Sequence, residues 1–207
     1  LGAMSQPAPE LPPSNPAAAS SLQRMARIVV ALAVLTALVA IAFAGGAAGA
    51  FAQAQPADCA RLAGLTFEGN TSITAATAVT GGTLTVSPTV SLTNLPPFCR
   101  VQGIIEKEIG FELWLPTAQE WNGKFLAGGV GGDAGTYNYA DLPRGVDRGY
   151  AAATTDTGHK AADLNWMLGD AMRLPNFEYR AHHLLAVKSK QIMGDFYRNK
   201  LQHAYFV

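Results

Sequence analysis

Residues 124 to 135 read Lys-Phe-Leu-Ala-Gly-Gly-Val-Gly-Gly-Asp-Ala-Gly, a short apolar run that enters a glycine-rich stretch. The run from Lys124 to Ala127 predicts a strand, and five glycines follow within the eight positions from Gly128 to Gly135. Glycine tolerates unusual backbone angles and close approach, so the amide groups of such a loop can face developing negative charge. By pattern alone, a flexible loop or a tight turn fits slightly better. A dinucleotide-binding loop fits less well, because the glycine spacing is not in register with a following helix.

Predicted strands and helices flank this glycine loop on both sides. Upstream, residues 110–116 alternate large apolar residues with others and stop at a proline, as a strand does. Downstream, residues 141–148 predict one or two helical turns, and residues 150–156 predict a small-residue strand buried on both faces. Residues 177–197 place apolar side chains mostly at helical spacing, and residues 204–207 predict a final strand. This order predicts an α/β fold with a parallel sheet and crossover helices.

Two segments of distinct composition open the chain. Residues 1–24 are rich in Pro, Ala and Ser, which predicts a disordered or untranslated upstream segment, since such a composition buries too little apolar surface to fold. Residues 25–52 combine a basic start, an apolar run and an Ala-Phe-Ala exit, which predicts a secretory signal peptide cleaved near Gln53. The apolar run is near the lower length limit for a bilayer span, so an uncleaved membrane anchor stays open as an alternative.

The rest of the chain divides into two further segments. Residues 53–100 are dominated by Thr, Val, Ser, Ala and Gly, which predicts a β-rich N-terminal extension. Residues 101–207 carry the α/β pattern and are expected to form the incomplete N-terminal portion of an α/β domain. Lys plus Arg and Asp plus Glu number 15 each, so nothing electrostatic points to nucleic acid or to an anionic membrane as a partner.

The common catalytic signatures are missing from the sequence. No Gly-x-Ser-x-Gly occurs, and none of Ser72, Ser87, Ser91 and Ser189 lies on a glycine-flanked strand-to-helix turn. The sequence also lacks His-Glu-x-x-His, paired Cys-x-x-Cys and Gly-x-x-x-x-Gly-Lys motifs. These residues therefore predict no assembled nucleophile.

Two histidine-containing motifs are candidates for chemistry. Thr-Asp-Thr-Gly-His at 155–159 follows the small-residue strand, so Asp156 and His159 fall where open α/β sheets collect functional groups. They fit a base and its orienting group, but a structural role, with Asp156 capping a turn, fits better without a nearby nucleophile. His182 and His183 lie on the long predicted helix, where adjacent residues point apart, so one packed and one solvated side chain is expected.

Cys59 and Cys99 both follow the predicted cleavage point. In an oxidising compartment, a disulfide between them would close a loop of about 40 residues and add about 3 to 4 kcal/mol to the stability by the chain-entropy model. The alternative is a pair of buried, unpaired thiols. The predicted signal peptide favours the disulfide.

A series of sequence blocks occurs in a fixed order between Cys59 and Val207. The blocks are Leu95-Pro96-Pro97-Phe98-Cys99-Arg100-Val101, Gly110-Phe111-Glu112-Leu113-Trp114-Leu115-Pro116, Trp121-Asn122-Gly123-Lys124-Phe125, the glycine loop, Thr155-Asp156-Thr157-Gly158-His159, Tyr179-Arg180-Ala181-His182-His183 and Tyr205-Phe206-Val207. Together they resemble the tannase and feruloyl esterase family of secreted α/β-hydrolases, to which the hydrolase of the terephthalate half-ester also belongs. The resemblance implies an α/β-hydrolase sheet with a β-rich N-terminal extension, truncated before the turn that carries the nucleophile.

The resemblance assigns roles to few residues of this chain. In the family, the strand that matches residues 204–207 runs into Gly-Cys-Ser-x-Gly-Gly, whose serine is the nucleophile. The Asp and His of the triad follow far downstream, beyond a lid domain that often binds calcium. None of these groups has a position here. The oxyanion-hole amide falls at Gly132, with Gly131 beside it, and the N-terminal disulfide falls on Cys59 and Cys99. Catalytic roles for Asp156 and His159 become less favoured.

The function that the resemblance implies is serine acyl transfer on esters of aromatic acids by a secreted or periplasmic enzyme. The expected partner is a small aromatic ester, bound only by a longer protein, with no nucleic acid and no stable membrane association once the signal is cleaved. These residues alone are expected to bind no cofactor and to hydrolyse nothing. The alternative function is a non-catalytic secreted or membrane-anchored binding protein.

Overall fold

The computed structural model describes residues 56–207, so the segments 1–24 and 25–52 lie outside the described residues. Its elements are α2 (Pro56–Leu62), β1 (Thr66–Phe67), β2 (Thr71–Val79), β3 (Gly82–Ser87), β4 (Val90–Leu95), β5 (Phe98–Ile105), β6 (Ile109–Pro116), β7 (Lys124–Gly128), α3 (Asp141–Asp147), β8 (Ala151–Thr155), α4 (Trp166–Gly169), α5 (Arg173–Pro175), the π-helix η1 (Asn176–Arg180), α6 (Ala181–Tyr197) and β9 (His203–Phe206). None of the helices in this part of the chain is both long and apolar enough to cross a bilayer.

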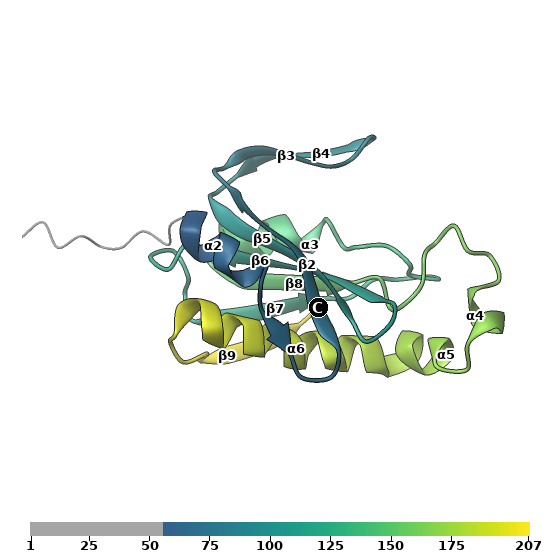
Figure 1. The fold of residues 1–207 in the computed structure, drawn as a ribbon. Helices are drawn as coiled ribbons and strands as arrows, with labels where there is room; N and C mark the ends of the chain where they lie inside the picture. The colour runs from purple at the N-terminus through teal and green to yellow at the C-terminus, as the bar shows by residue number, and fades with distance from the viewer. Residues whose placement is uncertain (1–55) are drawn as a thin grey trace, which may run out of the picture. The chain divides into compact units, whose positions relative to one another are not determined.

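The main sheet has seven strands in the order β1-β2-β5-β6-β8-β7-β9, with helices on its two faces (Figure 1). Strand β7 runs parallel to its neighbours β8 and β9, whereas every other pair is antiparallel. The predicted parallel sheet is therefore right for three strands and wrong for the other four. The reason is the short turn between β5 and β6, because parallel neighbours need a crossover of a dozen or more residues.

The two crossovers that make β7, β8 and β9 parallel bring helices to opposite faces of the sheet. The chain passes from β7 to β8 through α3, and from β8 to β9 through α4, α5, η1 and α6. The helices predicted from 141–148 and 177–197 are confirmed, and η1 adds one π-helical turn at the start of the second. Strand–helix–strand connections are nearly always right-handed, and these two run in opposite directions along the sheet. Their helices therefore lie on opposite faces.

Hydrophobic side chains form one cluster on each face of the sheet. The first cluster packs α2 and α6 against the sheet, with Leu62, Leu185 and Ile192 fully buried. The second cluster packs α3 and the β3–β4 hairpin against the opposite face, where Trp114 stacks on Phe98 with ring centroids 4.4 Å apart. Every residue of the central strands β6 and β8 is buried, because both of their faces are covered.

The small residues of β8 allow α3 to approach the sheet closely. A Cβ atom at Gly145 of α3 would lie 2.7 Å from the Cβ atom of Ala152, closer than carbon atoms can pack. Glycine at this position is thus required by the contact between helix and strand.

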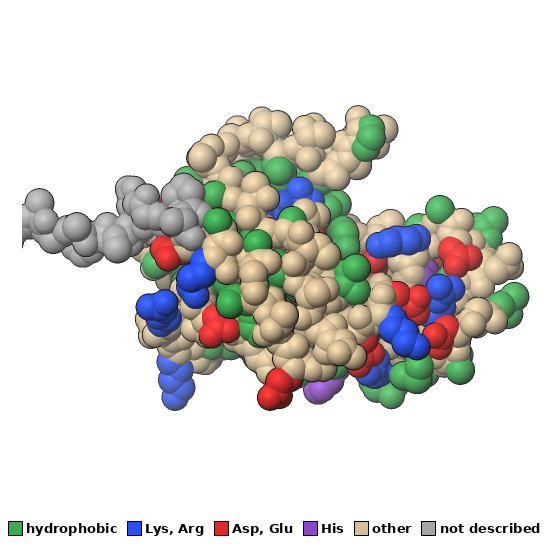
Figure 2. Space-filling model, viewed as in Figure 1, with side chains coloured by type: hydrophobic (Ala, Val, Ile, Leu, Met, Phe, Trp, Pro, Cys, Tyr) green, Lys and Arg blue, Asp and Glu red, His purple; other side chains and the backbone are tan. Residues whose placement is uncertain are grey.

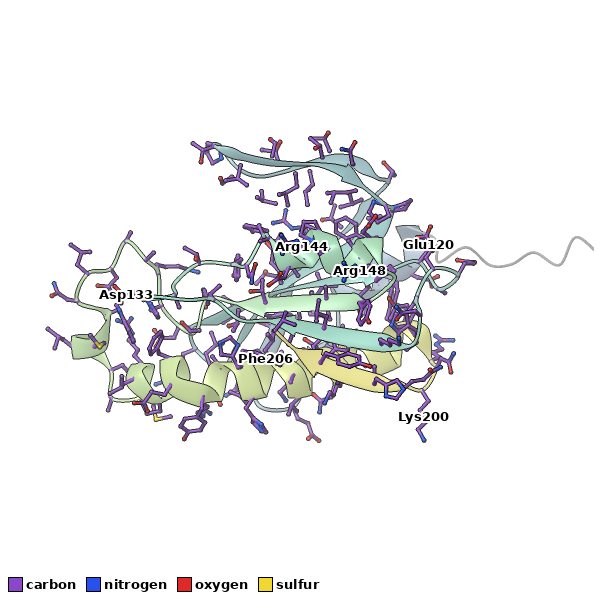
Figure 3. The ribbon with its side chains drawn as sticks, turned by 180° about the vertical axis from the view of Figure 1, so that it is seen from behind. Glu120, Asp133, Arg144, Arg148, Lys200 and Phe206 are labelled. Atoms are coloured by element: carbon purple, nitrogen blue, oxygen red, sulfur yellow. A yellow bond between two sulfur atoms is a disulfide. The ribbon has the colours of Figure 1, made fainter. Side chains whose placement is uncertain are left out.

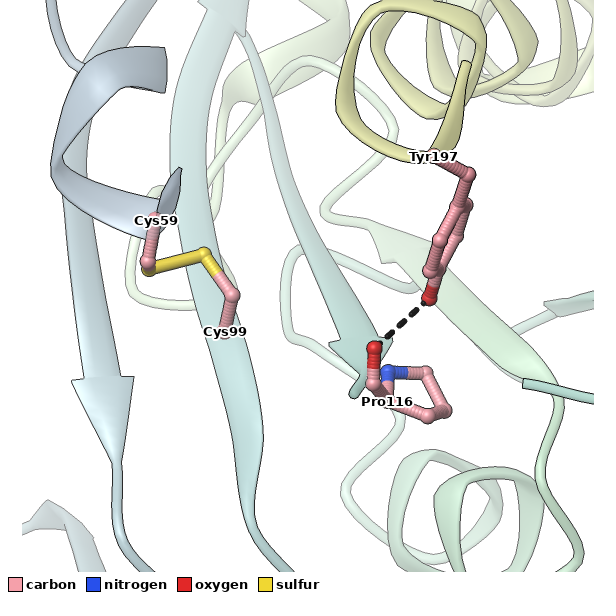
Figure 4. The surroundings of a disulfide bond; sticks show 4 residues. All are labelled: Cys59, Cys99, Pro116 and Tyr197. Atoms are coloured by element: carbon pink, nitrogen blue, oxygen red, sulfur yellow. Dashed lines mark hydrogen bonds between the residues drawn. A yellow bond between two sulfur atoms is a disulfide. The ribbon is translucent and has the colours of Figure 1, made fainter. Parts of the chain in front are cut away.

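The segment that the sequence assigns to an extension joins the main sheet. Strand β2 pairs with β5 from Thr71 to Val79, and only β3 and β4 form a separate hairpin. Helix α2, which the sequence analysis did not predict, lies beside β5. The predicted disulfide between Cys59 and Cys99 is present, with Cα atoms 5.5 Å apart, and it ties α2 to the start of β5 (Figure 4).

Charged and apolar side chains are both exposed around α4 and α5 (Figure 2). Arg173 forms an ion pair of 3.0 Å with Glu108, and Arg180 pairs with Glu106, so α5 and η1 are tied to the turn between β5 and β6. Leu164 and Leu168 are 89% and 83% exposed. The ion pairs fix the second crossover at the edge of the sheet where its strands β7, β8 and β9 end.

The C-terminal end of α6 is anchored by Tyr197. Its ring stacks on Trp121 with centroids 3.9 Å apart, and its hydroxyl donates a hydrogen bond of 2.9 Å to the carbonyl oxygen of Pro116 (Figure 4). Burial raises the pKa of the Tyr197 phenol well above its usual value. The tyrosine thus holds the helix against the end of β6 in its neutral form.

The double variant Cys59→Ala, Cys99→Ala is expected to lower the free energy of unfolding by about 4 kcal/mol, because a closed loop of 40 residues restricts the unfolded chain. Urea denaturation of the full chain measures this loss. A reducing agent should lower the urea midpoint of the wild-type protein to about that of the double variant. The urea midpoint of the double variant should stay unchanged. Equal midpoints for the oxidised and reduced wild-type protein would contradict the prediction.

Alkaline titration tests the role of Tyr197. Its folded pKa is raised, so its stabilising effect is complete below the unfolded pKa of 10.0 and is lost as the pH rises above that value. The unfolded tyrosine ionises first, which removes about 1.4 kcal/mol of stability for each pH unit. Tyr197→Phe is expected to lack this part of the alkaline loss, while it loses about 1 kcal/mol near pH 7 with the hydrogen bond. Urea midpoints between pH 8 and 11 should show the two slopes, and parallel curves would argue against the assignment.

Candidate functional site

The candidate site lies at the edge of the sheet where the parallel strands β7, β8 and β9 end. The carboxyl ends of parallel strands are the usual place for functional groups in open α/β sheets. Both motifs from the sequence, the glycine loop at 128–135 and the segment 155–159, start at this edge. Figure 3 shows Asp133 of the glycine loop beyond the end of the sheet to which β9 points, whereas Glu120 and Lys200 lie at the opposite end.

The glycine loop begins directly beside the end of β9. The amide of Gly129 donates a hydrogen bond of 2.8 Å to the carbonyl oxygen of Val207, and the amide of Val207 donates one of 3.0 Å to Ala127. A Cβ atom at Gly129 would lie 3.0 Å from Cζ of Phe206, so a larger residue would crowd this contact. The residue that follows β7 is therefore bonded directly to the residue that follows β9.

The exposed part of the loop runs from Gly131 to Asp133 and includes both glycines. Each has open space where a Cβ atom would be, and Gly132 adopts a left-handed φ of 61°. Within residues 56–207, no protein oxygen accepts a hydrogen bond from either amide. Exposed amides without a protein acceptor are suited to bind an anionic oxygen. These are the two residues to which the family resemblance assigns the oxyanion hole.

Asn138 holds the start of the loop. Its Nδ2 atom donates to the carbonyl oxygen of Gly129 at 2.6 Å and to Oδ2 of Asp141 at 2.7 Å. Its Oδ1 atom accepts from the amides of Ala140 and Asp141 at the beginning of α3. Asn138 was not predicted from the sequence, although an Asn just before the acidic first turn of a helix is a typical start signal.

His159 holds the far end of the loop. Its Nε2 atom lies 2.6 Å from the carbonyl oxygen of Asp133, and its ring stacks on Trp166 at a centroid distance of 3.9 Å. Phe177 contacts the same ring edge-on, and the histidine is only 4% exposed. Aromatic stacking of this kind adds about 0.5 to 1.5 kcal/mol. The imidazole is therefore fixed in place against the loop.

Asp156 shapes the turn that leads to His159. Its Oδ1 atom accepts hydrogen bonds from the amides of Gly110 at 2.8 Å and Gly158 at 3.0 Å, and its Oδ2 atom pairs with Lys160. The carboxylate is 1% exposed. No hydrogen bond joins Asp156 to His159 in the described part of the chain. The structural interpretation of Asp156, as the cap of a turn, is confirmed.

A buried polar network supports the loop from the side of α3. The carboxylate of Glu112 is fully buried and accepts hydrogen bonds from Arg100 at 3.0 Å, Trp114 at 2.9 Å and Tyr139 at 2.8 Å. Burial, followed by the charge of Glu112, raises the pKa of Tyr139. Tyr139 therefore remains a neutral donor, and it connects the segment after the glycine loop to the centre of the sheet.

The two adjacent histidines of α6 differ as expected. His182 is half-buried and contacts Phe206 of β9 edge-on at 5.3 Å, whereas His183 is exposed. Burial lowers the pKa of His182. Across residues 56–207, no group of three or more His, Cys, Asp or Glu side chains is arranged to hold a metal ion.

A family model described as tannase and feruloyl esterase matches residues 94–207. An uncharacterized esterase of Xanthomonas campestris pv. campestris is 35% identical over 156 residues, which are 72% of this chain and 27% of that esterase. The probable feruloyl esterase B-2 of Aspergillus flavus is 32% identical over 113 residues, which are 53% of this chain and 21% of the relative. The matched part is thus about a quarter of the length of these relatives.

Solved structures show the same fold. The crystal structure of an esterase from Aspergillus oryzae has a TM-score of 0.67 at 25% identity, and it matches 73% of this chain and 32% of its own. The crystal structure of feruloyl esterase B from the same species has a TM-score of 0.64 at 24% identity, over 73% of this chain and 32% of its own. Both likenesses agree with the expected α/β-hydrolase sheet.

Asp156→Ala is expected to lower the free energy of unfolding by about 3 kcal/mol or more, because the buried amides of Gly110 and Gly158 both lose the carboxylate that accepts from them. Asp156→Asn is the matched control: it keeps an oxygen at Oδ1 and should cost about 1 kcal/mol. Urea denaturation of the full chain compares the two. Equal losses for both variants would show that the charge, and not the acceptor, is what the turn requires.

Proposed function

Because this chain belongs to the tannase and feruloyl esterase family, we propose that it forms the oxyanion-binding part of a serine esterase that cleaves esters of aromatic acids. The name of the relative from Aspergillus flavus supports an aromatic acid as the acyl group. Gly132 and Gly131 supply the backbone amides that bind the oxyanion. The serine that attacks the ester lies outside the residues of this chain.

The hydrogen bond between the amide of Gly129 and the carbonyl of Val207 carries this proposal. It places the start of the glycine loop, two residues before Gly131, against the residue that follows β9. We infer that a serine in a turn after β9 stands within reach of the amides of Gly131 and Gly132. Attack by that serine produces a tetrahedral intermediate, and the negative charge on its oxygen is what the amides stabilise. One such donor lowers the barrier by about 3 to 4 kcal/mol.

The serines of residues 56–207 do not fit the role of the nucleophile. In the sheet, β5, β6 and β8 separate Ser72 of β2 from β7. Ser87 and Ser91 lie in the separate hairpin of β3 and β4, and Ser189 is fully buried in α6. The amides have no reaction to assist until a serine is supplied, so the 207 residues alone hydrolyse no ester. We propose that the triad Asp and His, and any calcium site in a lid, belong to the longer protein as well.

The disulfide supports a secreted or periplasmic location, because disulfides persist in oxidising compartments. A signal peptide at residues 25–52 would deliver the chain there. The proposed partner is then a small aromatic ester that the longer protein meets outside the cytoplasm.

The coding sequence beyond Val207 tests the position of the nucleophile. We expect it to continue with Gly-Cys-Ser, and a stop codon at that point would favour a non-catalytic protein.

The purified chain should release no ferulic acid from methyl ferulate, whereas the longer protein should do so. Gly132→Ala, which strains a left-handed residue, should lower kcat of the longer protein by roughly tenfold to hundredfold. Activity of the 207-residue chain by itself would contradict the assignment.

A further inference from the structure

We propose that His159 is a positioning residue: it holds the glycine loop so that the amides of Gly131 and Gly132 stay directed toward the reacting carbonyl. This inference rests on the proposed function of the two glycines. His159 itself contacts the loop and not the exposed edge, so its effect is exerted through the backbone.

The hydrogen bond to Asp133 fixes the protonation of one ring nitrogen. A carbonyl oxygen can only accept, so Nε2 of His159 carries the hydrogen and donates it over 2.6 Å. Asp133 directly follows Gly132, and its carbonyl belongs to the peptide that continues to Ala134. Orienting this peptide fixes the chain one residue beyond the exposed amides.

The loop needs such a restraint because its backbone is strained. Ala134 adopts a left-handed φ of 53°, a region that non-glycine residues with a Cβ atom rarely occupy. Residues in such conformations persist only when their surroundings hold them there. Ala134 is buried, and its amide donates to the carbonyl oxygen of Gly131 at 3.3 Å, so the strained residue closes a turn around Gly132.

The histidine is itself well restrained. Trp166 covers one face of the ring with an interplanar angle of 8°, and Phe177 contacts its edge. Thr157 and Gly158 both have left-handed φ angles, and Asp156 binds the amide of Gly158, so the turn before His159 has a defined shape. A donor held by packing on several sides can position a loop accurately.

The restraints at the two ends of the loop come from different elements. Asn138, just before α3, binds the carbonyl of Gly129, and His159, after β8, binds that of Asp133. On the far side of the exposed glycines, the bond from Ala161 to Gly135 lies two residues beyond the histidine contact. Without the histidine donor, the next restraint from another element after Gly132 is the bond at Gly135, so Gly132 is held less tightly. The start of the loop stays attached to Asn138.

Two variants separate the donor from the packing of the ring. His159→Phe keeps an aromatic ring for Trp166 and removes the donor, whereas His159→Gln keeps a donor nitrogen and removes the stack. Amide hydrogen exchange of the full chain, read by NMR, reports the order of the loop at Ala134, with Ala152 in β8 as the reference. We expect His159→Phe to speed exchange at Ala134 by about tenfold or more with Ala152 unchanged, and His159→Gln to stay near wild type.

Kinetics of the longer esterase give the second measurement. His159→Phe should lower kcat on methyl ferulate by roughly tenfold to hundredfold with KM within about twofold, and His159→Gln should restore most of kcat. Unchanged exchange at Ala134 in His159→Phe would overturn the inference, as would a His159→Gln variant that behaves like His159→Phe. If the longer wild-type protein is inactive, the proposed function fails, and the exchange data still decide whether His159 orders the loop.

Discussion

The parallel pairing of β7 with both β8 and β9 is the constraint on which the rest of the structure depends. It brings the carboxyl ends of three strands to one edge, and it forces each connection to cross a face of the sheet. Helix α3 covers one face and α6 the other, so the same pairing that creates the edge also builds both hydrophobic clusters. Because β7 lies between its two neighbours, the loop that follows it emerges at the middle of this edge, against Val207.

Local pattern was sufficient to predict most elements, because their signals are carried by neighbouring residues. The small, uncharged run of β8 indicates a strand covered on both faces, and the spacing of apolar residues indicates α6. The pairing of Cys59 with Cys99 followed from the predicted compartment and the family resemblance. Strand direction was harder, since the antiparallel pairing of β2, β5 and β6 depends on contacts between distant segments. Helix α2 was missed because its seven residues carry too little periodic signal.

The candidate site shows the same division between local and distant information. The glycines at 131 and 132 were identified from composition and from the resemblance, since a glycine-rich loop after a strand is a local signal. The role of His159 was not, because its partner, the carbonyl of Asp133, is 26 residues away in the sequence. A histidine after a strand suggests catalysis by its type alone, yet here the fold uses it to hold a backbone oxygen. Residue type suggested chemistry at this position, and only the contacts showed which group the side chain binds.

The contacts around the glycine loop explain how its two exposed amides can lack protein acceptors in an otherwise ordered segment. Asn138 and His159 bind the carbonyl oxygens of Gly129 and Asp133, so these side chains hold the loop without using the amides of Gly131 and Gly132. Contacts that used those two amides instead would leave them unable to bind an anion. The buried network of Glu112 also orders this region without using the two amides, because Tyr139 connects the segment after the loop to the centre of the sheet. The proposed stabilisation of negative charge at this edge depends on such order, since donors that are already oriented need no rearrangement when the charge forms.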